Sequence, residues 1–141
     1  MKQKFIILFA CLVLTAVSVS GQQKITDSLE RAIRTGAVKD TNRINALNRL
    51  AITYWYSNSE RALNLSREAV RLSTEIGFDR GLAVASNILG VAFDIISEFD
   101  SALFYYEKAA HLSRKTGYNV ILASALNNMG MVYQSRGDYK K

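Results

Sequence analysis

Small and aromatic residues recur along this chain at a spacing that places them on one face of an α-helix. In three segments a small residue is followed three positions later by an aromatic residue. The pairs are Ala51 with Tyr54, Gly90 with Phe93, and Gly130 with Tyr133. Because the small residues lie 39 and 40 positions apart, the pattern predicts the same amphipathic helix in three successive repeats.

A second helix is predicted in each of the two complete repeats. Its alanines are seven positions apart and therefore lie on one stripe of the helix. They are Ala62 and Ala69 in the first repeat, and Ala102 and Ala109 in the second. Small side chains on facing stripes let two helices approach closely, which also accounts for a helix-weakening glycine at Gly90. Each repeat is thus expected to be an antiparallel helix hairpin.

The predicted turns carry their own signals. Gly77 and Gly117 each follow a long apolar segment and precede an aromatic residue, which is typical of a left-handed glycine at a helix C-terminus. In the first hairpin, Ser57, Asn58 and Ser59 are candidates for capping the second helix. The absence of proline from all 141 residues also favours helices over strands. We therefore predict an all-α protein built of stacked antiparallel hairpins.

The repeats define one array, at residues 22–141. It comprises a half-repeat at 25–36, repeats at about 43–79 and 82–119, and an incomplete third repeat at 122–141. The third repeat supplies a first helix and only the start of a second. Because repeat arrays need a capped end, we expect this chain to be the N-terminal piece of a longer protein, marginally stable and frayed at its end.

This pattern resembles the tetratricopeptide repeat (TPR) family over roughly residues 40–141. The resemblance rests on the small-then-aromatic pairs, the two alanines of each second helix and the aromatic Tyr106. The period of about 40 exceeds the family's 34, and glycine stands where proline often ends a repeat. The resemblance implies a right-handed α-solenoid that binds proteins or peptides on its concave face. Similar long-period arrays in bacterial proteins precede a membrane segment and a signalling domain.

Residues 1–21 match the three-part pattern of a secretory signal peptide. Lys2 and Lys4 precede an apolar run that ends at Val17, and the small residues Ser20 and Gly21 follow it. The run is shorter than the roughly 20 apolar residues that a membrane-spanning helix needs. We therefore predict cleavage near residue 21 and export to the periplasm or cell envelope.

Removal of the predicted signal peptide also changes the cysteine content and the net charge expected for the mature chain. Cys11, the only cysteine, lies inside its apolar run, so the mature chain is expected to have neither a disulfide nor a reactive thiol. The formal net charge of +6 falls by two units when Lys2 and Lys4 leave, and the remaining charges alternate in sign along the helices. Nucleic acid is therefore not an expected partner. We expect the protein to contact a membrane only through a segment beyond Lys141.

The sequence contains no recognisable catalytic or metal-binding arrangement. The only histidine, His111, has no second histidine for a metal site and no nucleophile nearby in the pattern. Asp94, Glu98 and Asp100 cluster near a predicted turn, where carboxylates typically cap the following helix. The glycines are accounted for by the repeat, so no phosphate-binding loop is predicted. We expect a protein that is not an enzyme and needs no cofactor or metal.

The expected binding surface is the face of the first helices. By the TPR resemblance, its ligand-facing residues are Asn48, Trp55, Tyr56, Asn87, Val91, Asp94, Asn127 and Gln134, with Ile95 beside them. The three asparagines share one register, and their amides offer donors and acceptors to an extended peptide backbone. The alternative is that they are ordinary polar surface residues. Some family members carry the basic residues of a carboxylate clamp at places that here hold Asn48, Ile52, Val91, Asn127 and Met131, so no such clamp is expected.

The sequence therefore predicts an exported TPR protein that binds a protein or peptide partner as part of a larger envelope protein. One alternative is the periplasmic sensory input region of a sensor histidine kinase or transcriptional regulator, with its output domain beyond Lys141. Another is a structural scaffold, which further repeats without an output domain would support. Self-association through the exposed C-terminal end also stays open.

Overall fold

The computed structural model describes residues 23–35 and 40–137; the predicted signal peptide at 1–21, with Cys11, lies outside them. The regular structure of the described residues is entirely α-helical, which confirms the predicted all-α class. A first helix spans residues 23–35. The later helices are α2 (Thr41–Tyr54), α3 (Ser59–Glu75), α4 (Asp79–Ile95), α5 (Phe99–Thr116) and α6 (Asn119–Ser135).

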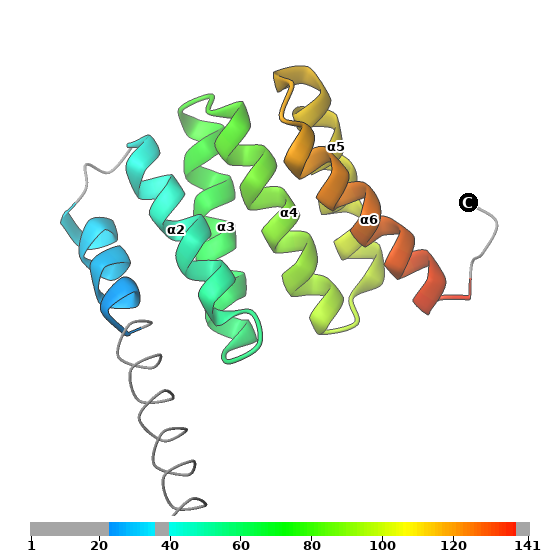
Figure 1. Cartoon of the computed structure of the whole chain (residues 1–141), viewed down its shortest axis with the longest axis horizontal. Helices are drawn as coiled ribbons and strands as arrows, with labels where there is room; N and C mark the ends of the chain where they lie inside the picture. Colours follow the sequence, from blue (N-terminus) through cyan, green and yellow to red (C-terminus); the bar gives the residue numbers. More distant parts are fainter. Residues whose placement is uncertain (1–22, 36–39, 138–141) are drawn as a thin grey trace, which may run out of the picture.

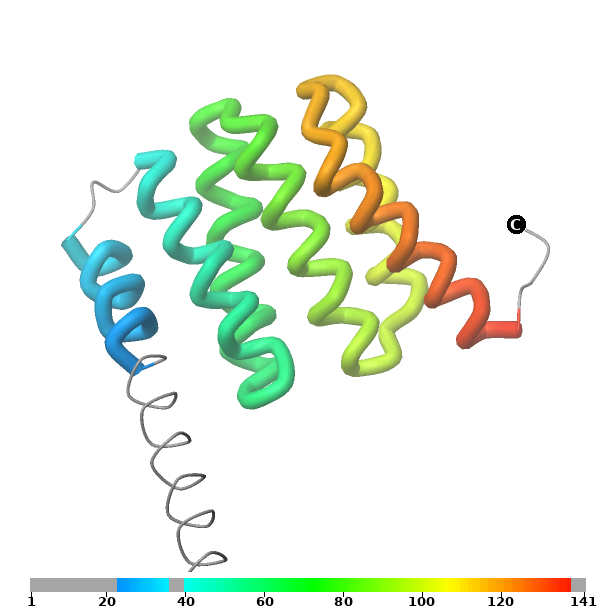
Figure 2. The backbone as a smooth tube through the Cα atoms, in the orientation of Figure 1, coloured from blue at the N-terminus to red at the C-terminus, as the bar shows by residue number. Residues whose placement is uncertain are grey.

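The helices stack in chain order as antiparallel hairpins, so the molecule is a helical-repeat solenoid. Helices α2 and α3 form one hairpin, and α4 and α5 form the next. Figure 1 shows α2, α4 and α6 side by side and running in the same direction, with α3 and α5 in a second layer behind them. The tube in Figure 2 shows the same two layers. Helix α4 packs against α2, α3, α5 and α6 and is therefore the centre of the array.

The turns follow from local sequence. Gly77 and Gly117 adopt left-handed backbone angles, with φ of 67° and 68°, as the pattern predicts. The aromatic residue after each glycine donates its backbone N–H at 2.9 Å to a carbonyl five residues earlier, which ends the helix. Asn58 caps α3, because its side chain accepts a 3.0 Å hydrogen bond from the N–H of Arg61. The turn after α4 instead places Ser97 in the left-handed region, at φ 63°.

The small residues of the repeat lie where helices approach most closely. Ala51, Ala62, Ala69, Ala102 and Ala109 are all fully buried. A Cβ atom added to Gly90 would lie 2.6 Å from the ring of Tyr106 and 3.2 Å from the carbonyl oxygen of Ala102. In the first hairpin the equivalent positions hold Ala51 and Ser66, both fully buried. Compared with the first hairpin, the second has the smaller Gly90 in place of alanine on its first helix and the much larger Tyr106 in place of serine on its second helix.

Candidate binding face

Apolar side chains occupy one register on the three first helices. Ile52 of α2, Val91 of α4 and Met131 of α6 are separated by 39 and 40 residues, and Tyr56 and Ile95 follow four residues after the first two. Because α2 packs against α4 and α4 against α6, positions of equal register lie on neighbouring helices. We call these five residues the apolar strip. The helices that carry the strip, α2, α4 and α6, lie side by side in one layer of the molecule (Figure 1).

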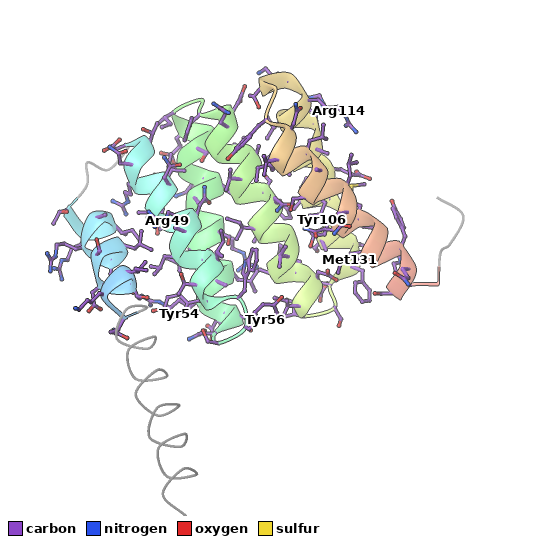
Figure 3. The ribbon with its side chains drawn as sticks, in the orientation of Figure 1. Arg49, Tyr54, Tyr56, Tyr106, Arg114 and Met131 are labelled. Atoms are coloured by element: carbon purple, nitrogen blue, oxygen red, sulfur yellow. The ribbon has the colours of Figure 1, made fainter. Side chains whose placement is uncertain are left out.

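Most of the apolar strip is open to solvent. Tyr56 is 90% exposed, Met131 52%, Ile52 44% and Ile95 39%, while Val91 is half-buried. Figure 3 shows Tyr56 beside the turn after α2 and Met131 on α6. The second helices of the described hairpins are α3 and α5. Of these two, only α5 carries an exposed large apolar side chain, that of Phe104. Solvent-exposed apolar groups therefore gather on the layer of first helices.

The apolar strip carries almost no charge. A neighbouring carboxyl is that of Asp94, next to Ile95 in the chain, and burial raises the pKa of this group. The pKa of the Tyr106 phenol is raised mainly by burial and, to a smaller extent, by the negative charge of Asp94. The buried hydroxyl of Tyr106 has no hydrogen-bond partner among the described residues. This environment suits apolar side chains, and the basic residue nearest to the strip in α2 is the exposed Arg49, three residues before Ile52.

The three asparagines share a register but not an environment. Asn48 and Asn87 are 3% and 5% exposed, whereas Asn127 is exposed. The amide of Asn48 donates to the carbonyl oxygen of Gly81 on α4 at 3.4 Å. The amide of Asn87 donates to the hydroxyl of Ser124 on α6 at 3.2 Å. These two side chains therefore join each first helix to the next, and the peptide-clamping role predicted for them stays untested.

A fourth asparagine was not predicted from the sequence. Asn128 of α6 donates from its amide to the side-chain oxygen of Asn87, with a donor–acceptor distance of 3.5 Å. Asn87 is three residues before Gly90 and so shares the helix face that the repeat buries. That spacing was the signal that Asn87 would point toward a neighbouring helix instead of solvent.

The remaining predicted site residues flank the apolar strip. Trp55 follows α2 directly and is half-buried, and its indole N–H has no acceptor among the described residues. Gln134 is exposed on α6. Trp55, Asp94 and Gln134 occupy equal registers, at separations of 39 and 40 residues. Of the two aromatic residues predicted to face the ligand, Trp55 and Tyr56, the second is therefore the more accessible.

Other features of the described residues offer little chemistry. An open cavity of about 280 Å³ lies along α3 and is lined by Asn58, Glu60, Arg61, Asn64, Leu65 and Glu68. Beside it, Arg61 pairs with Glu30 of the first helix, which raises the pKa of the arginine. His111 is exposed. Within residues 23–35 and 40–137, no group of acidic, histidine or cysteine side chains has a metal-binding arrangement, and no helix is long and apolar enough to span a membrane.

No protein-family model matches the chain, and no curated protein matches it. The proposed function therefore rests on the geometry of the first helices, α2, α4 and α6.

Proposed function

We propose that this chain is a non-enzymatic binding module of the TPR type, which holds an extended segment of a partner protein across the apolar strip. The observation that carries this proposal is the alignment of five apolar residues over three neighbouring helices, four of them exposed by 39% or more. Contiguous exposed apolar groups on a soluble surface typically mark an interaction site. Stacked helix hairpins use the same layer of helices for binding in other repeat proteins.

The dimensions of the strip fit a short extended peptide. Packed helices lie roughly 8–10 Å apart, so the distance from α2 to α6 is about 20 Å. An extended chain rises about 3.3 Å per residue, and about six residues therefore cross the strip. Side chains on one face of that peptide recur about every 7 Å, which is close to the spacing of the helices. Alternate side chains of the ligand can thus each meet one helix.

The chemistry of the strip further limits which ligands can bind there. Ile52, Val91 and Met131 provide no basic group, so a free C-terminal carboxylate has no counter-charge there. Charged groups of both signs flank the strip, because Arg49 is exposed three residues before Ile52 and the carboxyl of Asp94 is next to Ile95 in the chain. We infer that the ligand is an internal segment with alternating apolar side chains and neutral residues between them. Tyr56, as the most exposed aromatic group, is the expected anchor for the largest apolar side chain.

Binding is tested by selecting ligands from a displayed random peptide library on the purified chain and measuring the Kd of synthetic copies by fluorescence anisotropy. Tyr56→Ala and Ile95→Ser are each expected to weaken binding by about tenfold or more. Phe104→Ala is the matched control, because Phe104 is 60% exposed but lies on α5 in the other layer. Ligands that ignore both strip substitutions, or that depend on Phe104, would contradict the proposal.

We also propose that the module acts outside the cytoplasm, in the periplasm or the cell envelope. The support is the signal-peptide pattern of residues 1–21. Fusing residues 1–30 to a reporter enzyme that is active only after export tests it directly. Reporter activity should disappear when Leu12 and Leu14 are both replaced by lysine, since two charges interrupt the apolar run. An inactive reporter that stays in the cytoplasm with residues 1–30 still attached would overturn the assignment.

A further inference from the structure

The three first helices share the apolar strip but differ in the charge beside it. Helix α2 has Arg49, which is exposed and stands three residues before Ile52 and seven before Tyr56. Intervals of three, four and seven residues place these side chains on one side of the helix. Helix α4 has the half-buried carboxyl of Asp94 there, and α6 (Asn119–Ser135) has no charged residue at all. The α2 end of the strip therefore carries a positive charge that α6 does not supply at the other end.

Arg49 has no charged partner within the described residues. The other arginine of α2, Arg43, pairs with Glu68 of α3 at 2.7 Å. Arg136, directly after α6, pairs with Asp100 of α5 at 2.6 Å. Both of those guanidinium groups are thus held by the layer of second helices. No described carboxylate lies within 4 Å of the Arg49 guanidinium, so its charge is available to a ligand on the strip.

Apolar contacts alone do not fix where an extended ligand lies on the strip. Ile52, Val91 and Met131 recur once per repeat, and the side chains on one face of an extended peptide recur about every 7 Å. A peptide shifted by two residues therefore makes similar apolar contacts in more than one register. Charge removes this equivalence, because the α2 end attracts an acidic residue, whereas the carboxyl of Asp94 repels one placed over α4.

We propose that Arg49 fixes the register of the ligand by pairing with an acidic side chain at the α2 end of the strip. The guanidinium donates two N–H groups to the carboxylate, in the bidentate geometry that arginine favours. The acidic residue lies within three residues of the ligand side chain that meets Ile52, because three extended residues span about 10 Å. This inference rests on the proposed function and adds the charge pattern of the ligand, which has a neutral centre and an acidic residue beyond its α2 end.

The test starts from a peptide that the library selection returns and that Tyr56→Ala weakens. The peptide is remade with blocked ends in three versions, which carry two glutamates before the apolar centre, two glutamates after it, or glutamines at both places. One glutamate version is expected to bind about two- to fivefold more tightly than the glutamine version in about 0.01 M salt, as is typical of an exposed ion pair. The gain should vanish in about 1 M salt, where the Debye length is only about 3 Å.

Substitutions of Arg49 assign the gain to this side chain. Arg49→Gln should abolish the difference between the glutamate and glutamine versions, and it should leave the Kd of the uncharged glutamine version within about twofold. Arg49→Glu should turn the gain into a loss, because like charges then meet. Arg114→Gln is the matched control, since Arg114 is also exposed and also lacks a described carboxylate within 4 Å, but lies on α5 in the other layer (Figure 3).

Three results would overturn the role of Arg49. The first is that neither glutamate version binds more tightly than the glutamine version. The second is a gain that persists in Arg49→Gln or is lost in Arg114→Gln. The third is a gain seen only in a further glutamine version with a free C-terminal carboxylate, because the partner would then be a chain end. In all three cases Tyr56→Ala still weakens binding and the proposed function stands, whereas a selection without any peptide that Tyr56→Ala weakens would overturn both.

Discussion

Adding one methyl group to Gly90 or to Gly130 should have opposite effects on stability. Both glycines lie inside a helix at equivalent positions of the repeat. In either helix, alanine is intrinsically better than glycine by about 1 kcal/mol. The surroundings decide the sign, because a Cβ at Gly90 meets Tyr106 and Ala102 at 2.6 and 3.2 Å, while a Cβ at Gly130 meets no described atom within 4 Å.

The expected magnitudes follow from these contacts. Overpacking a filled core costs about 1–3 kcal/mol. Tyr106 is fully buried and cannot swing into solvent, and the Ala102 carbonyl belongs to the backbone, so we expect the upper part of this range. Gly90→Ala should therefore lower the free energy of unfolding by about 1–2 kcal/mol after the gain in helix propensity. Gly130→Ala should raise it by about 0.5–1 kcal/mol.

Urea unfolding followed by circular dichroism measures both changes, with the slope against urea as a check that the unfolding transition stays the same. The sign of each change in the free energy of unfolding, and the difference between the two changes, are more informative than either absolute value, since the two substitutions are chemically identical. If Gly90→Ala proved as stable as Gly130→Ala, the close approach of α5 to α4 would not exist in solution.

Four further changes test individual side chains. Ser97→Gly should raise the free energy of unfolding by about 1 kcal/mol, because serine is strained at a left-handed φ; a loss in urea unfolding would contradict this. Asn87→Ala should cost about 1–3 kcal/mol by leaving the partners of a buried amide unpaired. Its matched control Asn127→Ala should stay within about 0.5 kcal/mol, and equal losses would show that both side chains are equally engaged. Tyr106→Phe removes a buried hydroxyl that has no partner in the described residues, so thermal unfolding should show unchanged or higher stability. The raised pKa of Asp94 favours its neutral form in the folded state, so its contribution is intact below about pH 4 and lost as pH rises. Asp94→Asn should therefore stabilise more at pH 7 than at about pH 3.5, and an equal gain at both would exclude a titrating carboxyl.

The sequence predicted the helices and turns because these depend on local chemistry and on spacing. The left-handed glycines and the Asn58 cap each need only a few neighbouring residues, and both are present in the structure. The left-handed Ser97 was not predicted, since serine gives no local signal for that conformation. Its equivalent forty residues later is Gly137, at φ 76°, and comparing these two positions would have identified the turn.

The candidate site was harder to predict, since exposure depends on neighbouring helices. The shared register of Asn48, Asn87 and Asn127 indicated a common role on a binding surface. In the structure the first two are buried against the next first helix, and only the third is exposed. Periodicity locates a residue on a face of its helix but does not say whether another helix covers that face.

Repeat register becomes informative about function when it is combined with exposure. Ile52, Val91 and Met131 share a register and remain open or half-open on all three helices, so their exposure does not depend on which helix follows. Gly90 and Gly130 share another register, yet one is buried and the other exposed. The first kind of position belongs to a surface that the array keeps free, as expected for a ligand site. The second kind is closed at Gly90, where Tyr106 of α5 lies against the glycine, and open at Gly130, so exposure at this register depends on the packing of a neighbouring helix.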